Sequence, residues 1–284
     1  MQVEKVINNN VVSTYDSKGN EVIIMGKGIG FQAKSGSEIE EDRIEKIFYL
    51  ESKSAFDKFR NLIQDMPLEH IQVSSDIIVY AGEVLKNKLS PNIYITLTDH
   101  ISFAIERFSQ GMLFSNPLLW DVQSLYRQEY LIGEYAVALI EKRIGIKLPE
   151  DEAASIALHI VNAEFNTAMS ETMNITKILP KILDRVKEEF NIKVDMQSIN
   201  HERFVTHLKF LAQRIVKGQQ YNDVDVEFCE MVKELYKREY KCSEEIAECL
   251  KENFNDTISG DELAMLTINI RRFISRHKVK KLGG

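Results

Sequence analysis

The sequence contains few of the residues that interrupt helices. Only 5 of its 284 residues are proline and 13 are glycine, which disfavours a turn-rich β-sandwich and favours helices over most of the chain. No apolar run approaches the roughly 18–20 residues needed to cross a bilayer. Residues 1–5 also lack the basic start and the apolar stretch of a secretory signal. We therefore expect a protein that is neither secreted nor inserted in a membrane.

Cysteine is scarce as well. Cys229, Cys242 and Cys249 are odd in number and show no Cys-x-x-Cys spacing, which favours reduced thiols in a cytoplasmic protein. The sequence also lacks a His-x-x-x-His metal motif, a glycine-rich loop that ends in Lys-Ser/Thr, and a nucleophilic triad signature. We therefore expect no catalytic activity and no cofactor.

Net charge and length place only broad limits on the partners of the protein and on its number of domains. The formal net charge of −7 is ordinary for a soluble protein and does not by itself suggest a nucleic-acid partner. Hydrophobic residues make up 44% of the chain, enough for packed cores, and the length allows two or three domains of about 100–150 residues.

The N-terminal residues have the pattern of strands. Short β-branched runs alternate with turn-forming segments rich in Asn, Asp and Gly, which predicts a small antiparallel sheet of about four strands. A sheet of this size is close to the limit for one stable core, so we expect it to dimerise. The runs lie in residues 3–7, 11–12, 22–24 and 47–50, and the turns in residues 8–10, 16–20 and 26–30.

From about residue 56 the apolar spacing becomes helical. Ser75 is predicted to cap one of the helices. The predicted fold class is multidomain α+β, with a small N-terminal antiparallel β-sheet domain followed by two homologous all-α helical-bundle domains. The expected boundaries are 1–56 for the sheet domain, 57–68 for a partly helical linker, 69–170 for the first helical domain and 171–284 for the second.

The two helical domains are related by an internal repeat. Residues 97–107 are echoed by residues 204–214, and each half carries an Asp-Glu pair that begins eight residues before a second shared position. A repeat of this length indicates a duplicated domain. Three of the four equivalent positions are His, a residue that changes charge or accepts a covalent group near neutral pH. The pairs are His100 and His207, Arg107 and Arg214, Gly111 and Gly218, and His159 and Asn269.

These motifs together resemble a known family. The segments 5–11 and 25–32 resemble the RNA-binding co-antiterminator domain of the BglG/SacY/LicT-type transcriptional antiterminators, and the helical repeats resemble the PTS regulation domains of the same proteins. PTS denotes the sugar phosphotransferase system. The resemblance implies a cytoplasmic homodimer that binds a leader-mRNA hairpin and prevents terminator formation in a sugar-utilisation operon. It also implies histidine phosphorylation that involves the phosphocarrier HPr and a sugar-specific PTS permease (enzyme II).

The RNA-binding end has a weak electrostatic signature. Residues 1–36 carry a net charge of +1, so recognition has to depend on shape, base edges and stacking. Lys27 stands where the family often has Arg, and it lacks the planar fork that allows a bidentate contact. By resemblance, the expected RNA contacts are Lys5, Asn10, Gly26, Lys27 and Phe31.

The expected phosphorylation sites are His100, His159 and His207, again by resemblance. On its helix, His159 shares a polar stripe with Glu152, Ser155 and Asn162, and we expect that stripe to face water or a domain interface. Asn269 departs from the family pattern and cannot accept a phosphoryl group, so phosphorylation of the second domain would rest on His207. The expected neighbours of these sites are Asp99, Arg107, Arg214 and Asn269. His70, His201 and His277 have no repeat partner and are predicted to lie on the surface.

Three alternatives remain open at this point. Each histidine could be a satisfied structural residue between helices. A metal-dependent enzyme could use His100, Asp99 and His159, although no ligand motif supports it. A DNA-binding activator with the same regulation domains is a further alternative, although residues 1–55 show strands and no recognition helix.

Overall fold

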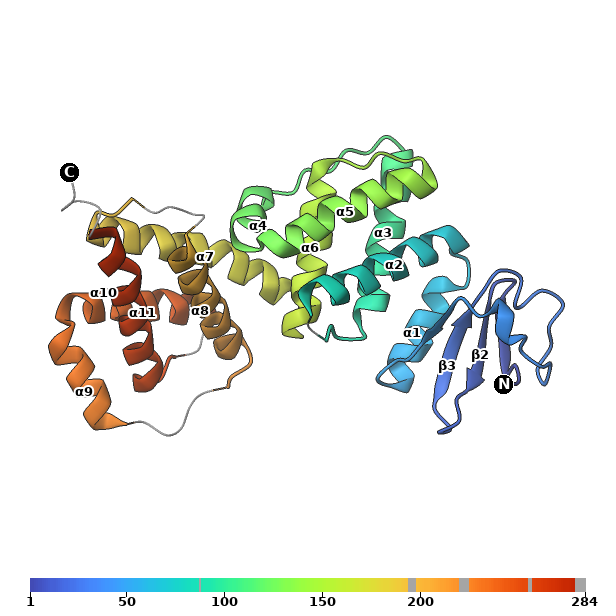
Figure 1. The fold of residues 1–284 in the computed structure, drawn as a ribbon, viewed down its shortest axis with the longest axis horizontal. Coiled ribbons are helices and arrows are strands. Elements are labelled where there is room, and N and C mark those ends of the chain that lie inside the picture. The colour runs from blue at the N-terminus through green and yellow to red at the C-terminus, as the bar shows by residue number, and fades with distance from the viewer. Residues whose placement is uncertain (87, 194–197, 220–224, 255–256, 279–284) are drawn as a thin grey trace. The chain divides into compact units, whose positions relative to one another are not determined.

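The computed structural model describes residues 1–86, 88–193, 198–219, 225–254 and 257–278, with side chains as far as Ser275. The chain forms two compact units (Figure 1). Unit 1 comprises residues 1–119 and 127–166, and unit 2 comprises residues 120–126 and the chain from 167 onward. No helix in the described part of the chain has both the length and the apolar character that a bilayer crossing requires.

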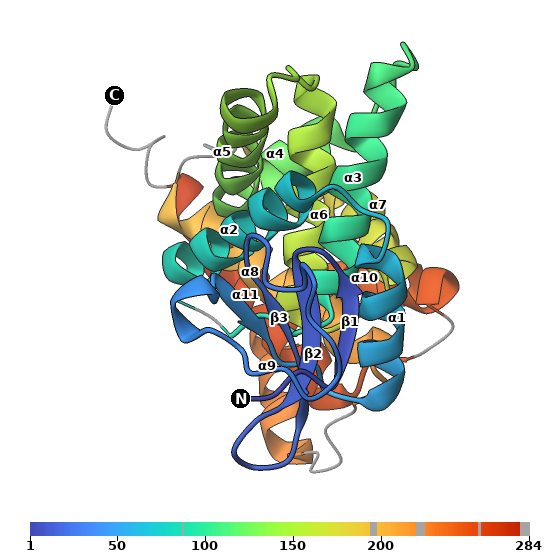
Figure 2. The same cartoon turned by 90° about the vertical axis from the view of Figure 1, so that its right-hand side faces the viewer.

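The predicted four-stranded antiparallel sheet is confirmed. Its strands follow the chain in the order β1-β2-β3-β4, and Figure 2 shows the first three side by side with a helix next to them. In the central pair, Val12 lies opposite Ile24 and Ser13 opposite Ile23. The strands are β1 (Lys5–Asn8), β2 (Val11–Tyr15), β3 (Glu21–Met25) and β4 (Lys46–Phe48).

Both faces of this sheet are buried. Val11 and Ile23 point to one face, which a helix covers, while Val12 and Ile24 point to the other, which the loop containing Ile29 covers. Successive side chains of a strand alternate between faces. Burial on both sides therefore accounts for the unbroken apolar run in β3, which a half-exposed strand would not have.

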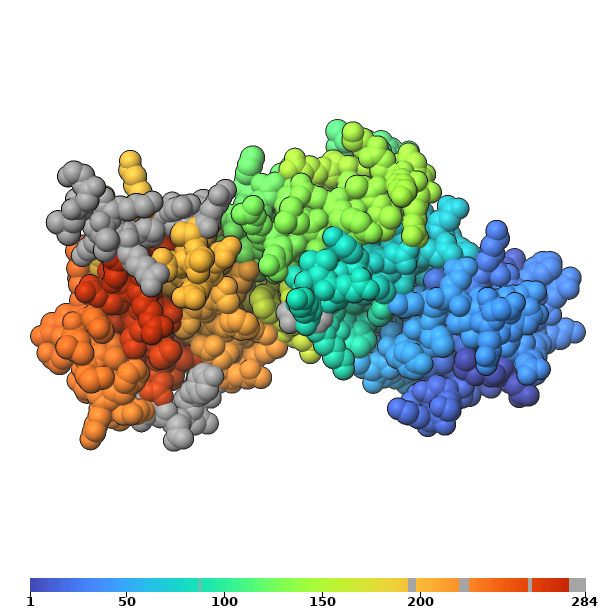
Figure 3. Space-filling model, viewed as in Figure 1, coloured from blue at the N-terminus to red at the C-terminus, as the bar shows by residue number. Residues whose placement is uncertain are grey.

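The segment that follows the sheet is a helix, α1 (Lys53–Ile63). The hydroxyl of Ser52 caps it by accepting a hydrogen bond from the Ala55 N–H at 3.2 Å. Phe56, Phe59 and Ile63 are buried in one cluster with residues of the sheet. Most of the predicted linker, residues 57–68, is thus a packed helix that lies between the sheet and the helical part of unit 1. In Figure 3 the blue surface of the N-terminal residues adjoins the teal surface of the first helices of the helical part of unit 1.

The remaining helices of unit 1 enclose an aliphatic core. The prediction that Ser75 caps a helix is wrong, because α2 begins directly after Pro67 and Ser75 is buried within it. Gly133 lets α5 and α6 approach closely, since a Cβ there would collide with the carbonyl oxygen of Ala153. The helices are α2 (Leu68–Leu85), α3 (Ile93–Ser109), α5 (Arg127–Ile144) and α6 (Glu150–Phe165).

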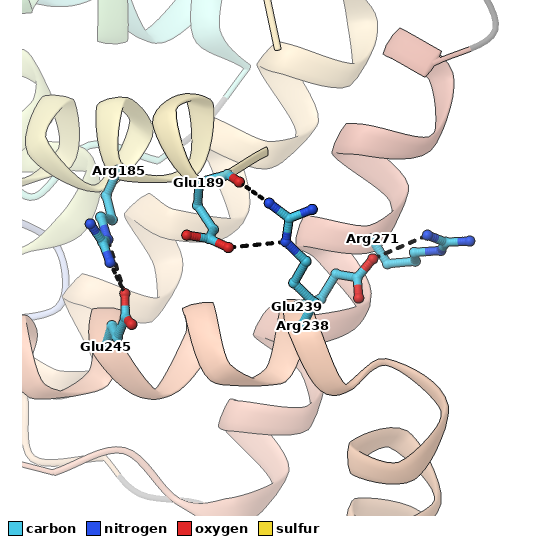
Figure 4. Close-up of polar contacts among 6 residues, drawn as sticks. All are labelled: Arg185, Glu189, Arg238, Glu239, Glu245 and Arg271. Carbon is cyan, nitrogen blue, oxygen red and sulfur yellow. Dashed lines mark hydrogen bonds and ion pairs between the residues drawn. The ribbon is translucent and has the colours of Figure 1, made fainter. Parts of the chain in front are cut away.

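All the regular secondary structure described in unit 2 is helical. Phe204 of α8 stacks on Phe273 of α11 with ring centroids 4.7 Å apart. Ion pairs join α10 to its neighbours: Arg185 with Glu245, Arg238 with Glu189, and Arg271 with Glu239 (Figure 4). The helices are α4 (Leu119–Leu125), which lies mostly in this unit, α7 (Met169–Phe190), α8 (Ile199–Val216), α9 (Val226–Leu235), α10 (Lys237–Phe254) and α11 (Gly260–Lys278).

Candidate functional site

Two turns are bonded to each other at one end of the sheet. The backbone N–H of Gly26 donates to the Asn10 carbonyl at 3.0 Å, and the N–H of Gly28 donates to the Asn10 side-chain oxygen at 2.8 Å. The N–H of Gly30 donates to the Asn9 carbonyl at 3.0 Å. We call residues 9–10 and 26–31 the turn surface. Its backbone shape is fixed before any ligand arrives.

The glycines of this surface are required by packing. A Cβ on Gly26 would collide with the carbonyl oxygen of Arg43, and a Cβ on Gly30 would collide with that of Asn8. Gly28 has a φ of +70°, a conformation that disfavours any side chain. Gly26, predicted to contact RNA, is buried, and the structure places it where it fixes the shape of the turn.

Three predicted contact residues are exposed, and two of them lie within these turns. Lys5 and Lys27 are exposed, and Phe31 has 61% of its surface accessible. Exposed aromatic and lysine side chains in one small domain offer a stacking surface and phosphate neutralisation. Asn10 is half-buried, and its side-chain oxygen is occupied by Gly28. The arrangement suits a single-stranded or bulged nucleic acid.

Asn8 connects the turn surface to α1. Its side-chain amide donates to the carbonyl oxygen of Ile63 at 3.0 Å and to that of Gln64 at 3.3 Å, while its side-chain oxygen accepts from the Asn10 N–H at 2.8 Å. One amide therefore satisfies the C-terminal end of α1 and also orders the β1–β2 turn. Nothing in the sequence pattern singled out Asn8 from its neighbours.

In unit 1, α3 and α6 bring His100, Arg107 and Glu152 together. Glu152 is 1% exposed and accepts a hydrogen bond from the Arg107 guanidinium through Oε1. Its Oε2 lies 3.2 Å from Nε2 of His100, within ion-pair distance but not aligned as a hydrogen bond. A buried carboxylate requires such charged partners. Glu152 was expected on the same polar stripe as His159 but was not among the neighbours predicted for the phosphorylation sites.

His159 lies against His100, with ring centroids 4.7 Å apart. Burial, and secondly the neighbouring His100, lowers the pKa of His159 to about 3. Its Nδ1 is buried and has no hydrogen-bond partner among the described residues. Of the two settings expected for its polar stripe, water and a domain interface, water is excluded for Glu152, Ser155 and Asn162, which are all buried. The imidazole of His159 is therefore neutral at physiological pH.

Unit 2 repeats the charged part of this arrangement. Nε of Arg214 on α8 lies 2.9 Å from Oε1 of Glu262 on α11, whose side chain is 4% exposed. Burial, and secondly the charge of Arg214, lowers the pKa of His207 to about 4. At the position equivalent to His159, the side-chain amide of Asn269 donates to the Met265 carbonyl of its own helix at 2.8 Å. The repeat thus has one imidazole here instead of two.

The aspartates of the repeated Asp-Glu pairs also have equivalent roles. The Asn116 N–H donates to Asp151 at 2.6 Å in unit 1, and the Asp225 N–H donates to Asp261 at 3.2 Å in unit 2. Each aspartate holds the connection that follows the histidine-bearing helix, while the adjacent glutamate pairs with an arginine of that helix. The duplication therefore preserves a whole polar framework as well as the histidines.

The other predicted residues lie apart from these clusters. Asp99 is exposed and faces away from His100, since adjacent helical residues point in different directions. Nδ1 of the half-buried His70 lies 3.0 Å from Oγ of Ser102. The prediction that His201 lies on the surface is wrong, because it is 2% exposed and its ring centroid is 6.5 Å from that of Phe273. The side chain of His277 is outside the described residues.

A metal centre finds no support in the part of the chain that the structure describes. No group of three or more His, Cys, Asp or Glu side chains there is arranged to hold a metal ion. His100 and His159 are in contact, but Asp99 does not join them.

Comparison with known proteins agrees with this architecture. Residues 1–56 match the family model described as the CAT RNA binding domain, and residues 75–163 and 180–273 each match the PRD domain. The chain is 44% identical over 276 residues to "Transcription antiterminator LicT" of Bacillus subtilis (strain 168), covering 97% of this chain and 100% of that protein. It is 40% identical over 272 residues to "Beta-glucoside operon antiterminator" of Dickeya chrysanthemi, covering 96% of each.

A solved structure extends the agreement to three dimensions. "Crystal structure of GlcT CAT-PRDI" is 39% identical with a TM-score of 0.52, covering 57% of this chain and 97% of that one. The sheet, the fixed turns and the duplicated helical domains thus define an RNA-binding regulator of transcription. The chain belongs to the family of transcription antiterminators that join a CAT domain to two PRD domains.

Proposed function

We propose that the turn surface binds a hairpin in a leader mRNA of a sugar-utilisation operon, and that binding prevents the overlapping terminator hairpin from forming. The observation that carries this proposal is the exposure of Phe31 and Lys27 on one turn segment whose backbone is fixed and which lies in the CAT match. In the proposed active form the protein is a homodimer, so that two turn surfaces contact one RNA.

Each of the five predicted contact residues has a distinct proposed role. Phe31 stacks on an unpaired base. Lys5 and Lys27 neutralise phosphates. The side-chain amide nitrogen of Asn10, which has no partner among the described residues, donates to a base edge. Gly26 holds the turn that presents them.

RNA binding by the full chain tests this proposal. A labelled antiterminator-type hairpin is compared with a scrambled stem-loop and with duplex DNA of the same sequence at fixed salt. Phe31→Ala is expected to weaken hairpin binding by roughly 5- to 150-fold, the loss of one base stack. Lys27→Gln is expected to weaken binding and to reduce its salt dependence, whereas Lys34→Gln, an exposed lysine outside the turn surface, serves as the matched control. Equal affinity for duplex DNA would favour a DNA-binding activator instead.

We further propose that phosphorylation of His100, His159 and His207 controls RNA binding, with HPr and a sugar-specific PTS permease as the partners. The lowered pKa values leave His159 and His207 neutral near pH 7, so each keeps a nitrogen lone pair that can attack phosphorus. The N–P bond of a phosphorylated carrier imidazole breaks as the new N–P bond forms. The electron pair of the broken bond stays on the carrier imidazole.

A phosphoryl group would disturb the charged framework of each unit. On His100 it would place negative charge beside the buried carboxylate of Glu152 and compete with it for Arg107. Since α3 carries the arginine and α6 the glutamate, this competition changes how the two helices pack. Arg214 and Glu262 provide the same competition for a phosphoryl group on His207. We propose that the resulting repacking changes how the two protomers associate. This association in turn sets the affinity with which two turn surfaces bind one RNA.

An antitermination reporter tests this control. His100→Ala and His159→Ala are expected to relieve inhibition without inducer, and His207→Ala is expected to reduce induction. His70→Ala, a half-buried histidine outside the clusters, is the matched control. Incubation of the purified proteins with phosphorylated HPr is expected to label His207 with acid-labile phosphate. Unchanged reporter output in all three variants would refute the proposed control.

A further inference from the structure

Unit 2 contains a polar cavity that the RNA surface and the histidine clusters do not explain. It has a volume of about 470 Å³ and lies between the first half of α8 and the second half of α11. Arg203 lines it from α8, while Arg271 and Arg272 line it from α11. Three guanidinium groups around one small cavity favour an anion there.

Two of these arginines lack a partner in the described part of the chain. Arg203 and Arg272 are exposed and form no hydrogen bond or ion pair with any described residue. Arg271 is held in place, because its Nη1 lies 3.1 Å from Oε1 of Glu239 (Figure 4) and its guanidinium lies 5.5 Å from the ring centroid of Tyr236. The cavity therefore has one anchored guanidinium group and two that no described side chain pairs with.

The other residues that line the cavity could contact the organic part of a ligand in addition to an anionic group. Asn200, Asn269 and Ser275 contribute neutral polar groups. The stacked rings of Phe204 and Phe273 form an apolar part of the wall. Guanidinium groups match the oxygens of a phosphate monoester, while amide, hydroxyl and apolar groups are typical contacts for the organic part of a small ligand.

The repeat shows that these charges are not required by the domain fold. At the positions of unit 1 equivalent to Arg203, Arg271 and Arg272, the sequence has Thr96, Val161 and Asn162, none of which is charged. The same part of the repeat has His159 in unit 1 and Asn269 in unit 2. Unit 2 thus has an amide in place of the second imidazole and gains arginines around it.

We propose that this cavity binds the phosphate group of a small phosphorylated organic molecule without covalent transfer. The binding site is separate from phosphoryl acceptance at His207, which does not line the cavity. The inference goes beyond the proposed RNA-binding function and does not depend on it. Its test therefore measures ligand binding and not transcription.

Calorimetric titration of the full, unphosphorylated chain tests the proposal, with intact mass used to verify that no phosphoryl group is present. The probes are glycerol 3-phosphate, glucose 6-phosphate and inorganic phosphate, with sulfate as the anion control. Saturable binding of at least one monoester, tighter than that of sulfate, is expected. Arg203→Gln and Arg272→Gln are each expected to weaken it by about tenfold or more, the loss of one charge-assisted contact.

Two control variants separate the cavity from other effects. Lys181→Gln removes an exposed charge on α7, outside the cavity, and is expected to leave binding unchanged. His207→Ala is also expected to leave it unchanged, which distinguishes the cavity from the phosphoryl acceptor. The proposal is overturned if no monoester gives saturable heat, if sulfate binds equally well, or if both arginine variants bind like the parent protein. Circular dichroism verifies that the variants are folded.

Discussion

Replacing His159 with asparagine should flatten the acid sensitivity of unit 1. Burial, and then His100, lowers the pKa of His159 to about 3 in the folded protein, against 6.5 for an ordinary histidine. Between these values the unfolded chain binds a proton that the folded chain does not. The free energy of unfolding therefore falls as the pH drops below about 6.5, and the decrease continues toward pH 3.

The size of this effect follows from the two pKa values. Between pH 7 and pH 5 the unfolded imidazole becomes mostly charged, while the folded His159 stays neutral. Proton linkage converts this difference into a loss of about 2 kcal/mol for the one residue. Asparagine does not titrate, so His159→Asn should remove this loss of unfolding free energy. The contributions of the other titratable groups should stay unchanged. Asparagine also occupies the equivalent position, Asn269, in unit 2.

Hydrogen exchange at α6 measures the effect in the correct unit. The opening free energy of α6 amides is determined at pH 7 and pH 5 for both proteins, after correction for intrinsic exchange. Amides of α10 in unit 2 serve as the internal control and should respond to pH equally in both proteins. The contrary result is a change in α6 opening free energy between pH 7 and pH 5 that is the same in His159→Asn and in the parent protein, within about 0.5 kcal/mol. That result would show that burial does not keep the imidazole of His159 neutral.

Further predictions concern stability. Glu152→Gln should destabilise unit 1 by about 2–4 kcal/mol in calorimetry, because Arg107 loses its buried counter-charge. Gly133→Ala should lower stability by about 2–3 kcal/mol through collision with a backbone carbonyl. Gly82→Ala, in a helix with open space around the site, should raise it by up to about 1 kcal/mol, and thermal melting compares the two. Asn8→Ala should cost about 1–2 kcal/mol and speed hydrogen exchange at the end of α1 but not in α6.

The sheet and the paired sites could be predicted because their signals are local or repeated. Runs such as Val22-Ile23-Ile24 between turn segments predict strands wherever they pack. The duplication aligned His100 with His207 and Arg107 with Arg214, so one comparison located both clusters. The glutamates at Glu152 and Glu262 were within the same repeat, but their role depends on which helices pack together.

Other features depend on tertiary packing that the spacing of residues does not encode. The stripe of α6 that carries His159 looks solvent-facing because it is polar, yet α6 is buried on several sides in unit 1. The start of α2 was misplaced because Ser75 resembles a cap, whereas Pro67 fits the non-helical position before the first turn. Arg203 stands one turn before His207 in the sequence, but its grouping with Arg271 and Arg272 around one cavity depends on how α8 packs against α11.

The position of α1 restricts where the chain can be cut when the sheet domain is transferred to another regulator. Phe59 and Ile63 complete the apolar layer under the strands, and both lie beyond residue 56, where the CAT match ends. A chimera joined at that residue would contain a sheet domain that lacks part of the apolar layer on one face. A graft that extends through Leu85 carries α1 and the α2 residue Ile71 with it, and so transfers all the fully buried residues of the layer, leaving behind only the partly buried Tyr94 and Ile95 of α3.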